Sequence, residues 1–423
     1  MLRARVADDK AAKMSGVTVH CDTRHRAMIT ACAIGATVLQ LLDQTIANVA
    51  LPYMQGSFSA SFAEITWVLT SYITASAIMT APVGWLAARY GRKVLYVGCI
   101  LGFTLASMLC GAAQSLSQIV VFRLLQGVFG AALVPLSQAT LLDIYRRGFA
   151  MAIWGVGVML GPIMGPTVGG WLTETYSWRW VFYINLPFGL LAAIGLMIFL
   201  PGGGQQGRLR FDWLGFSVLA VAIGSMQLML DRGQEKDWFT SREIITEAVF
   251  ASLGFYLFLV HVSSVRQPLI HPALFKDVNF ASGVLLMFMV GIFMVSSLAL
   301  MTPWLQLLSH YPVETAGLIM APRGFGSLVT TMLTGRLAAR LDARLLVGIG
   351  LLMLSYSYWM MTGWTPDVSA REIIIAIVIQ GAAMGLLFTP IQVLAFVTLD
   401  SSMRTEGAAL FSLLRNLGAA IGV

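Results

Sequence analysis

Long, uninterrupted runs of apolar residues recur along the whole sequence. A helix of about 20 apolar residues is long enough to cross the hydrocarbon core of a bilayer. Because 57% of the residues are hydrophobic and only 11% are charged, lipid must be the main solvent of the folded chain. The runs predict an all-α polytopic membrane protein. They exclude a membrane barrel, whose strands alternate apolar and polar residues.

Twelve such runs are complete enough to be predicted as membrane-spanning helices. The predicted spans cover residues 27–51, 65–88, 94–112, 117–142, 149–171, 179–200, 213–231, 245–265, 281–308, 314–335, 344–363 and 373–398. A thirteenth begins near Arg404 and is still apolar at Val423. We therefore expect the last one to two helices of the fold to be missing from this chain.

Lysine and arginine gather in the N-terminal tail and in every second loop, whereas most of the alternate loops hold none. Basic residues collect on the cytoplasmic side of membrane proteins. The amino terminus is therefore predicted to be cytoplasmic. The same loops account for the net charge of +7, so nucleic acid is not an expected partner. The first 26 residues lack the apolar stretch of a signal peptide.

Three sequence motifs of the first half return in the same order in the second half. GWLAARYGRKVLYVG is echoed by GRLAARLDARLLVGIG, QGVFGAALVPL by QGAAMGLLFTP, and GPIMG by GAAIG. The paired motifs begin at Gly84 and Gly335, Gln126 and Gln380, and Gly161 and Gly418, at offsets of 251, 254 and 257 residues. This repeat predicts two parallel halves of six helices each, with the seventh and eighth spans inserted between them (6+2+6).

The repeat and the spans together divide the chain into four predicted parts. These are a cytoplasmic tail (1–26), an N-terminal six-helix half (27–200), a linker with two extra transmembrane helices (201–270), and a truncated C-terminal half (271–423).

The chain resembles the 14-span drug:proton antiporters of the major facilitator superfamily, of the EmrB/QacA type. The matching stretches are LLDQTIANVALP from Leu41, GWLAARYGRK from Gly84, RLLQGVFGA from Arg123, GVMLGPIMGPTVGG from Gly157, WRWVFYINLP from Trp178, DRGQEKDWF from Asp231, and EGAALFSLLRNLGAAIG from Glu406. The resemblance implies the major facilitator fold and proton-coupled multidrug efflux by alternating access across the bacterial inner membrane. It also implies drug-like substrates and a proton gradient as the energy source.

Asp43 lies deep in the first apolar run, eight residues from its outer end at Leu51, or about 12 Å at 1.5 Å per residue. A carboxylate inside a membrane is costly and usually marks an ion or substrate path. Its functional interpretation is a proton carrier, and the alternative is a structural carboxylate. Arg123 lies at a similar depth in the fourth span, as a counter-ion for proton coupling or as a permanent packing partner.

The loop after the second span contains the residues that form a gating latch in the resembled family. They are Gly84, Arg89, Gly91, Arg92 and Lys93. An acidic residue usually stands where this chain has Ala88. We therefore expect Arg89 or Arg92 to pair with another carboxylate, such as Asp143 at the end of the fourth span. A plain cytoplasmic anchor is the alternative interpretation.

Glycines recur at every fourth position of the fifth span, namely Gly157, Gly161, Gly165 and Gly169. Such a ridge lets a neighbouring helix approach closely. Pro162 and Pro166, beside the ridge, are predicted to kink the helix and to remove backbone donors. In the resembled family this stretch is the antiporter signature, although packing alone would also explain it.

Arg323 in the tenth span and Arg415 in the thirteenth are two further basic residues inside the predicted membrane region. Their motifs leave open whether they bind substrate or pair with Asp43. We find no pattern of a metal site, a cofactor or an enzyme, so none is expected.

The leading functional alternatives are an exporter of one specific metabolite and a truncated chain that does not transport. In the resembled family, relatives act with a periplasmic adaptor (EmrA-like) and an outer-membrane channel. The polar outward segment from Asp231 to Glu247 is the predicted contact for such an adaptor.

Overall fold

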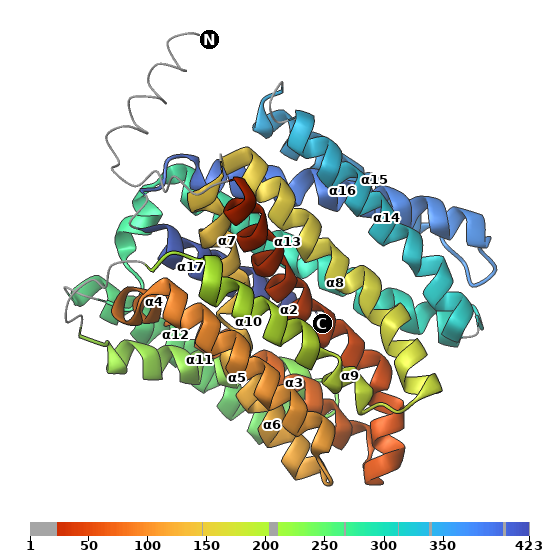
Figure 1. Ribbon diagram of the computed structural model, residues 1–423. Coiled ribbons are helices and arrows are strands. Elements are labelled where there is room, and N and C mark those ends of the chain that lie inside the picture. Colours follow the sequence, from red (N-terminus) through yellow and green to blue (C-terminus); the bar gives the residue numbers. More distant parts are fainter. Residues whose placement is uncertain are drawn as a thin grey trace.

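The computed structural model describes residues 23–145, 147–202, 210–265, 268–311, 313–337, 341–400 and 403–422. Within these ranges the chain folds into helices that run roughly side by side in one bundle (Figure 1). Nine of the described helices are long and apolar enough to cross a membrane. The tail up to residue 22 lies outside the described residues, while residues 23–26 already belong to the first helix.

Each of the first six predicted spans corresponds to one helix or a pair of consecutive helices. They are α2 (Thr23–Phe58), α3 (Phe62–Thr80) with α4 (Val83–Tyr90), α5 (Arg92–Ala112), α6 (Leu116–Gly130) with α7 (Leu133–Ile144), α8 (Arg147–Thr175), and α9 (Trp180–Tyr183) with α10 (Asn185–Phe199). The second span breaks at Pro82, which cannot continue the hydrogen-bond ladder of α3.

The later spans follow the same pattern. They are α11 (Trp213–Arg232), α12 (Arg242–Ser264), α13 (Val278–Pro303), α14 (Val313–Leu337), α15 (Ala343–Thr362), α16 (Ala370–Val397) and α17 (Arg404–Ile421). A single π-helical turn at Trp304–Leu308 ends the ninth span. The polar segment after Asp231 is shorter than the sequence suggests, because α11 continues to Arg232 and a 3₁₀ turn at Trp238–Thr240 leads directly to α12.

Helix pairing repeats between the first and second halves. In the first half α2 packs against α8, α3 against α6, and α5 against α6. In the second half the repeat-equivalent pairs are α13 with α17, α14 with α16, and α15 with α16. The helices α11 and α12 pack against each other, and α11 also contacts α3. This pairing agrees with two related halves, while the 6+2+6 count stays a prediction.

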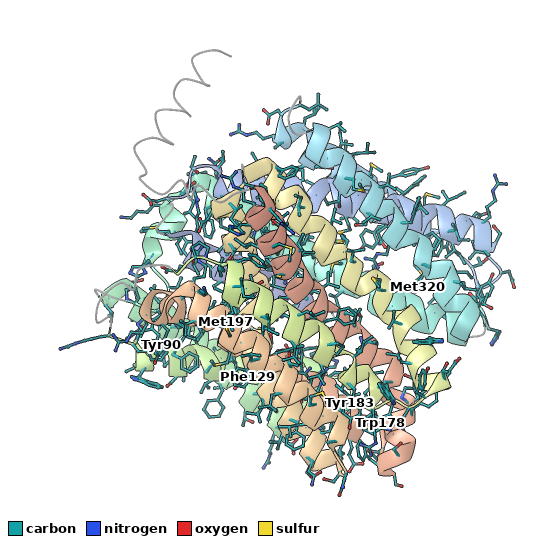
Figure 2. The ribbon with its side chains drawn as sticks, viewed as in Figure 1. Tyr90, Phe129, Trp178, Tyr183, Met197 and Met320 are labelled. Atoms are coloured by element: carbon teal, nitrogen blue, oxygen red, sulfur yellow. The ribbon has the colours of Figure 1, made fainter. Side chains whose placement is uncertain are left out.

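The two halves meet along α8, which contacts α14 and α16, and along α17, which contacts α3, α4 and α7. In Figure 1, α14 and α16 lie along one flank of α8, and α2 lies along the other. Apolar side chains project outward around the bundle in Figure 2, where Met197 and Tyr90 are 53% and 51% exposed. Such apolar exposure over the whole bundle suits a protein surrounded by lipid.

Candidate functional site

The carboxylate of Asp43 is fully buried at the centre of the N-terminal half. Arg123, which α6 carries, is also fully buried and forms a salt bridge with it, with 2.6 Å between Nη1 and Oδ2. Their similar depth predicted this pairing. A buried ion pair is most stable when further hydrogen bonds satisfy its remaining donors and acceptors.

Two amides complete the surroundings of the Asp43 carboxylate. Nε2 of Gln126 and Nδ2 of Asn185 each donate to Oδ1 at 2.9 Å. Gln126 lies one turn beyond Arg123 on α6, and its Oε1 accepts a hydrogen bond from Nη1 of that arginine at 2.8 Å. Three donors from two different helices therefore hold one carboxylate.

Arg123 is fixed from the side of α3 and α9. Its Nε donates to the carbonyl of Val68 at 3.1 Å. Its guanidinium stands over the rings of Tyr72 and Phe182, at 4.5 and 5.5 Å from the ring centroids. Its Nη2 has no hydrogen-bond partner among the described residues. The cation is thus surrounded by aromatic faces, and one of its donors is left available.

The sequence stretches that place Gln126 and Asn185 were recognised, but their role was not. Gln126 stands in the repeated QG motif, and Asn185 in WRWVFYINLP, where a lone asparagine interrupts apolar residues. For Asn185, an amide between apolar neighbours was the available signal, and for Gln126 it was its place one helical turn from Arg123. Asn185 also donates to Ser107 at 2.9 Å, which extends the network to α5.

The glycine ridge of α8 packs directly against α2, the helix that carries Asp43. A β-carbon at Gly161 would come within 2.6 Å of Cβ of Leu41 and 2.9 Å of the nitrogen of Leu42. A β-carbon at Gly157, Gly165 or Gly169 would meet Ile34, Thr45 or Ile46 at under 3.0 Å.

The predicted close approach of a neighbouring helix is therefore confirmed, and it fixes the position of Asp43. The helix runs without interruption from Arg147 to Thr175, and the side chains of Pro162 and Pro166 lie outside the described residues.

In the stretch from Gly84 to Lys93, Arg92 pairs with Asp143, as the sequence predicts from the departure at Ala88. Asp143 also accepts from Arg404 of α17 at 3.2 Å, and Arg92 donates to Thr405 at 3.0 Å. We call Arg92, Asp143, Arg404 and Thr405 the Asp143 cluster.

A β-carbon at Gly84 would lie 3.0 Å from Cα of Glu406, so the two halves are in contact beside the cluster. Gly91 adopts a φ of 84°, which a side chain would strain. Arg89 and Lys93 have no ion pair among the described residues.

A second set of contacts joins the halves inside the same end of the bundle. Gln138 of α7 donates to Gln392 of α16 at 3.1 Å, and both are fully buried. The two glutamines are 254 residues apart, the offset between the two QG motifs, so they are repeat-equivalent. Next to them the rings of Trp154 and Phe388 are stacked at 5.8 Å.

Arg323 and Arg415 do not pair with Asp43, since Arg123 occupies that carboxylate. Nη2 of Arg323 donates to the carbonyl of Met294 at 3.1 Å, and Nη2 of Arg415 to Oδ1 of Asn416 at 3.2 Å. Among the described residues no carboxylate pairs with either arginine. Of the two alternatives that the sequence left open for them, pairing with Asp43 is wrong.

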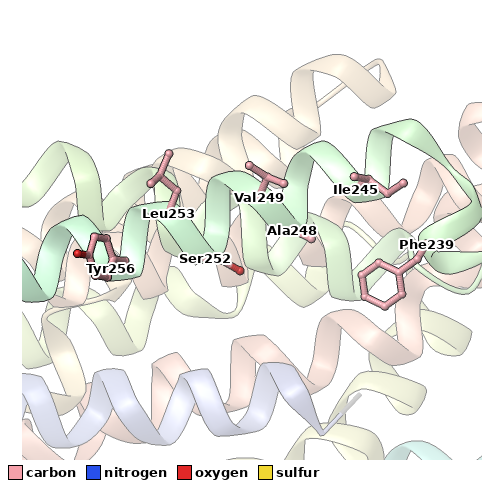
Figure 3. Close-up of a pocket in the computed structure, with 7 residues that line it drawn as sticks. All are labelled: Phe239, Ile245, Ala248, Val249, Ser252, Leu253 and Tyr256. Atoms are coloured by element: carbon pink, nitrogen blue, oxygen red, sulfur yellow. The ribbon is translucent and has the colours of Figure 1, made fainter.

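A shallow apolar groove lies elsewhere, on the outer face of α12. Its lining residues are Phe239, Ile245, Ala248, Val249, Ser252, Leu253 and Tyr256 (Figure 3). Its mostly apolar lining suits lipid contact. The described residues contain no group of histidine, cysteine or acidic side chains that would hold a metal ion.

Two related helical halves, one of which holds a buried ion pair beside a glycine ridge, are the arrangement of membrane transporters that work by alternating access. Residues 33–423 match the model of the Major Facilitator Superfamily, so the chain belongs to that family, as its sequence motifs predicted.

The chain is 35% identical over 394 residues to the multidrug export protein EmrB of Escherichia coli (strain K12), covering 92% of this chain and 77% of that protein. It is 34% identical to the fatty acid resistance protein FarB of Neisseria gonorrhoeae, with the same shares covered.

The fold is similar to that of the human organic anion transporter MFSD10, with a TM-score of 0.70, 14% identity, and coverage of 94% of this chain and 92% of that one. At this identity the likeness concerns the fold alone. The sequence relatives place the chain among the EmrB-type members of the superfamily, as the motifs predicted.

Proposed function

We propose that this protein exports hydrophobic or amphipathic compounds across the bacterial inner membrane in exchange for protons. The observation that carries the proposal is the fully buried Asp43–Arg123 pair. Asp43 is the only acid deep in a predicted span, and its partner cation lies on another helix. The multidrug export role of the EmrB relatives supports the same substrate class.

In the proposed cycle, Asp43 is ionised while Arg123 and the amides of Gln126 and Asn185 hold its oxygens. When the outer side opens, a proton reaches the carboxylate and cancels its attraction to Arg123. Substrate leaves outward, and the protonated protein turns toward the cytoplasm. There Arg123 returns to the carboxylate and expels the proton. Coupling thus results from a change in the distance between one acid and one base.

The Asp143 cluster and the Gln138–Gln392 pair act as the cytoplasmic closure of this cycle. Both connect the first half with the second. They must separate before substrate can enter from the cytoplasm. The orientation rests on the basic loops, which place the amino terminus and the Asp143 cluster on the cytoplasmic side.

The turn between α11 and α12 is the proposed contact for a periplasmic adaptor (EmrA-like), which would pass substrate to an outer-membrane channel. It is held by ion pairs of Arg232 with Glu243 and Glu247, at 2.9 and 3.4 Å. Trp238 and Phe239 are exposed beside them, at 38% and 64%. A rigid turn with exposed aromatic rings suits protein recognition.

The proposal is tested in inverted membrane vesicles, in which export runs inward and consumes the pH gradient. Candidate drugs are added to vesicles with the wild-type chain or with Asp43→Asn, and collapse of the gradient is followed by a pH-sensitive dye. We expect drug to collapse the pH gradient in vesicles with the wild-type chain, and we expect Asp43→Asn to abolish this response.

Asp367→Asn is the matched control, because Asp367 is exposed in the loop between α15 and α16, outside the turn proposed for the adaptor. It is expected to behave as wild type. Drug-dependent proton exchange by Asp43→Asn at the wild-type rate would assign Asp43 a structural role only. An inactive wild-type chain would favour the non-transporting alternative.

A further inference from the structure

The two halves share the same helix crossing beside their central polar groups. In the first half, a β-carbon at Gly127 of α6 would lie 2.5 Å from the carbonyl oxygen of Tyr72 on α3. In the second half, a β-carbon at Gly381 of α16 would lie 2.0 Å from the carbonyl oxygen of Arg323 on α14. Tyr72 and Arg323 are also 251 residues apart, the offset between Gly84 and Gly335. Sequence and geometry therefore make Arg323 the counterpart of Tyr72.

The groups around this crossing are partly conserved between the halves and partly exchanged. Gln380 is the counterpart of Gln126, and both are fully buried. Ile377 stands at the counterpart position of Arg123, 254 residues later. The second half therefore keeps the glutamine and keeps a cation, but the cation comes from α14 instead of α16.

The second half has no counterpart of the Asp43 carboxylate. The part of α13 that faces this crossing reads GIFMVSS from Gly291 to Ser297, and α13 contains no acid at all. In the first half Nε2 of Gln126 donates to Asp43. In the second half Oε1 of Gln380 accepts from Ser297 at 2.9 Å, while Nε2 has no acceptor among the described residues. A buried amide donor without an acceptor is costly, and it indicates a place for one.

Arg323, like Gln380, uses only part of its hydrogen-bonding capacity. The hydroxyl of Tyr358 lies near Arg323, Gln380 and Ser297 and donates to the carbonyl of Phe293 at 2.6 Å. The guanidinium of Arg323 has five donors, and one of them binds Met294. No carboxylate of the described residues balances its charge. In the membrane interior such a cation usually marks a substrate or ion path.

This cluster faces the interface between the two halves. Ser327 lies one helical turn from Arg323, and its Oγ contacts Sδ of Met159 on α8 at 3.0 Å. One turn further, Thr331 lies beside Gly155 of α8. Arg323 itself is partly exposed, in contrast to the fully buried Arg123. The thioether of Met159 and the small side of α8 at Gly155 thus lie one to two turns from Arg323 along α14.

We propose that Arg323 and Gln380 bind the carboxylate of an amphipathic organic acid between the two halves. The anionic group of the substrate supplies the carboxylate that α13 lacks, and its apolar part lies against α8. This proposal deepens the proposed function, on which it rests, by naming the substrate class and the residues that select it.

The test measures binding to the purified chain in nanodiscs of phosphatidylcholine, without a proton gradient. The probes are radiolabelled dodecanoate and uncharged dodecanol, which share their apolar chain. We expect Arg323→Gln to weaken dodecanoate binding about tenfold or more, because a charge-assisted contact is lost, and to leave dodecanol binding unchanged. Arg371→Gln removes an exposed arginine from the first turn of α16 and is expected to bind both probes as wild type does.

Two variants at Gln380 sharpen the test. Gln380→Leu removes the free donor at similar size and is expected to weaken dodecanoate binding only. Gln380→Glu supplies the missing carboxylate from the chain itself and is expected to pair with Arg323 and block dodecanoate. Unchanged dodecanoate binding by Arg323→Gln, or equal loss of both probes, would overturn the proposal.

Two further experiments distinguish a failure of this binding proposal from a failure of the proposed proton coupling, and substrate binding from lipid binding. Asp43→Asn is expected to bind dodecanoate normally although it does not exchange protons, so a failure of proton coupling leaves the binding result intact. Nanodiscs with added phosphatidylglycerol offer an anionic lipid headgroup. If that lipid displaces dodecanoate in wild type but not in Arg323→Gln, a lipid occupies the site and the substrate proposal is wrong. We expect no such displacement.

Discussion

Asp43 and Arg123 are both removed from solvent, and neither charge would be stable there alone. The cost of burying an isolated ion is several kcal/mol even after relaxation. Here each ion meets the other at 2.6 Å, and amide donors or aromatic faces cover the remaining sides. The pair is therefore balanced as a unit, and a change to one partner affects the other.

Replacing the cation tests this balance. Arg123→Gln is expected to destabilise the protein by about 3–5 kcal/mol, because it leaves Asp43 as an unpaired buried carboxylate. Thermal unfolding of the purified protein in detergent measures the loss. The double variant Asp43→Asn with Arg123→Gln removes both charges and is expected to recover most of the stability. Equal destabilisation of the single and double variants would show that packing of the arginine, and not charge, dominates.

At the scale of helices, the position of Asp43 depends on how closely α2 can approach α8. Lipid tails are as apolar as the helix surfaces, so helix association in a membrane relies on close van der Waals packing. The four glycines of α8 remove the side chains that would separate the helices. The ridge therefore sets the depth and distance of Asp43 although it contacts no charge.

One added methyl group distinguishes a packed glycine from a free one. Gly161→Ala places its Cβ 2.9 Å from backbone atoms of α2, which cannot rotate away, whereas a Cβ at Gly170 meets nothing within 4 Å. Alanine favours a helix over glycine by about 1 kcal/mol. We expect Gly170→Ala to match or exceed the wild-type melting temperature and Gly161→Ala to lower it and reduce transport. Identical melting temperatures for the two variants would contradict the ridge.

Features that depend on periodicity were predictable from the sequence, and features that depend on side-chain direction were not. The apolar runs predicted the positions of the helices, and the similar depths of Asp43 and Arg123 predicted their contact. The role of Asn185 was missed because WRWVFYINLP does not show which face of α10 meets α2. The sequence also suggested a long outer loop after Asp231, because charged residues at helix ends resemble loop residues.

At the scale of the whole molecule, the repeat places equivalent residues opposite each other. Gln138 and Gln392 meet across the interface because each occupies the same position in its own half. Because equivalent positions can be compared, a difference between the halves is informative. Asp43 of the first half has no acidic counterpart on α13 of the second half. Under the two proposals, one half holds a proton and the other holds an anion.

The final prediction concerns the closure between the halves. Asp143→Asn weakens two partly exposed ion pairs, to Arg92 and to Arg404. Only the pair with Arg404 joins the two halves, so at about 0.2–1 kcal/mol for one exposed pair the closed state should lose roughly 1.4- to 5-fold in population against a state that is open at this end. Spin labels at Tyr90 and Lys276, exposed residues in different halves, report the change as a longer distance between the labels.

Asp237→Asn, in the turn at the opposite end, is the control and should leave the distance distribution unchanged. If the Asp143 cluster helps to hold the halves together, Asp143→Asn shows a larger fraction of long distances between the labels. It also shows a faster drug-independent leak of the pH gradient in vesicles. If the distribution of Asp143→Asn matches that of wild type, the buried contacts of Gln138 with Gln392 and of Trp154 with Phe388 hold the halves together without help from the loop.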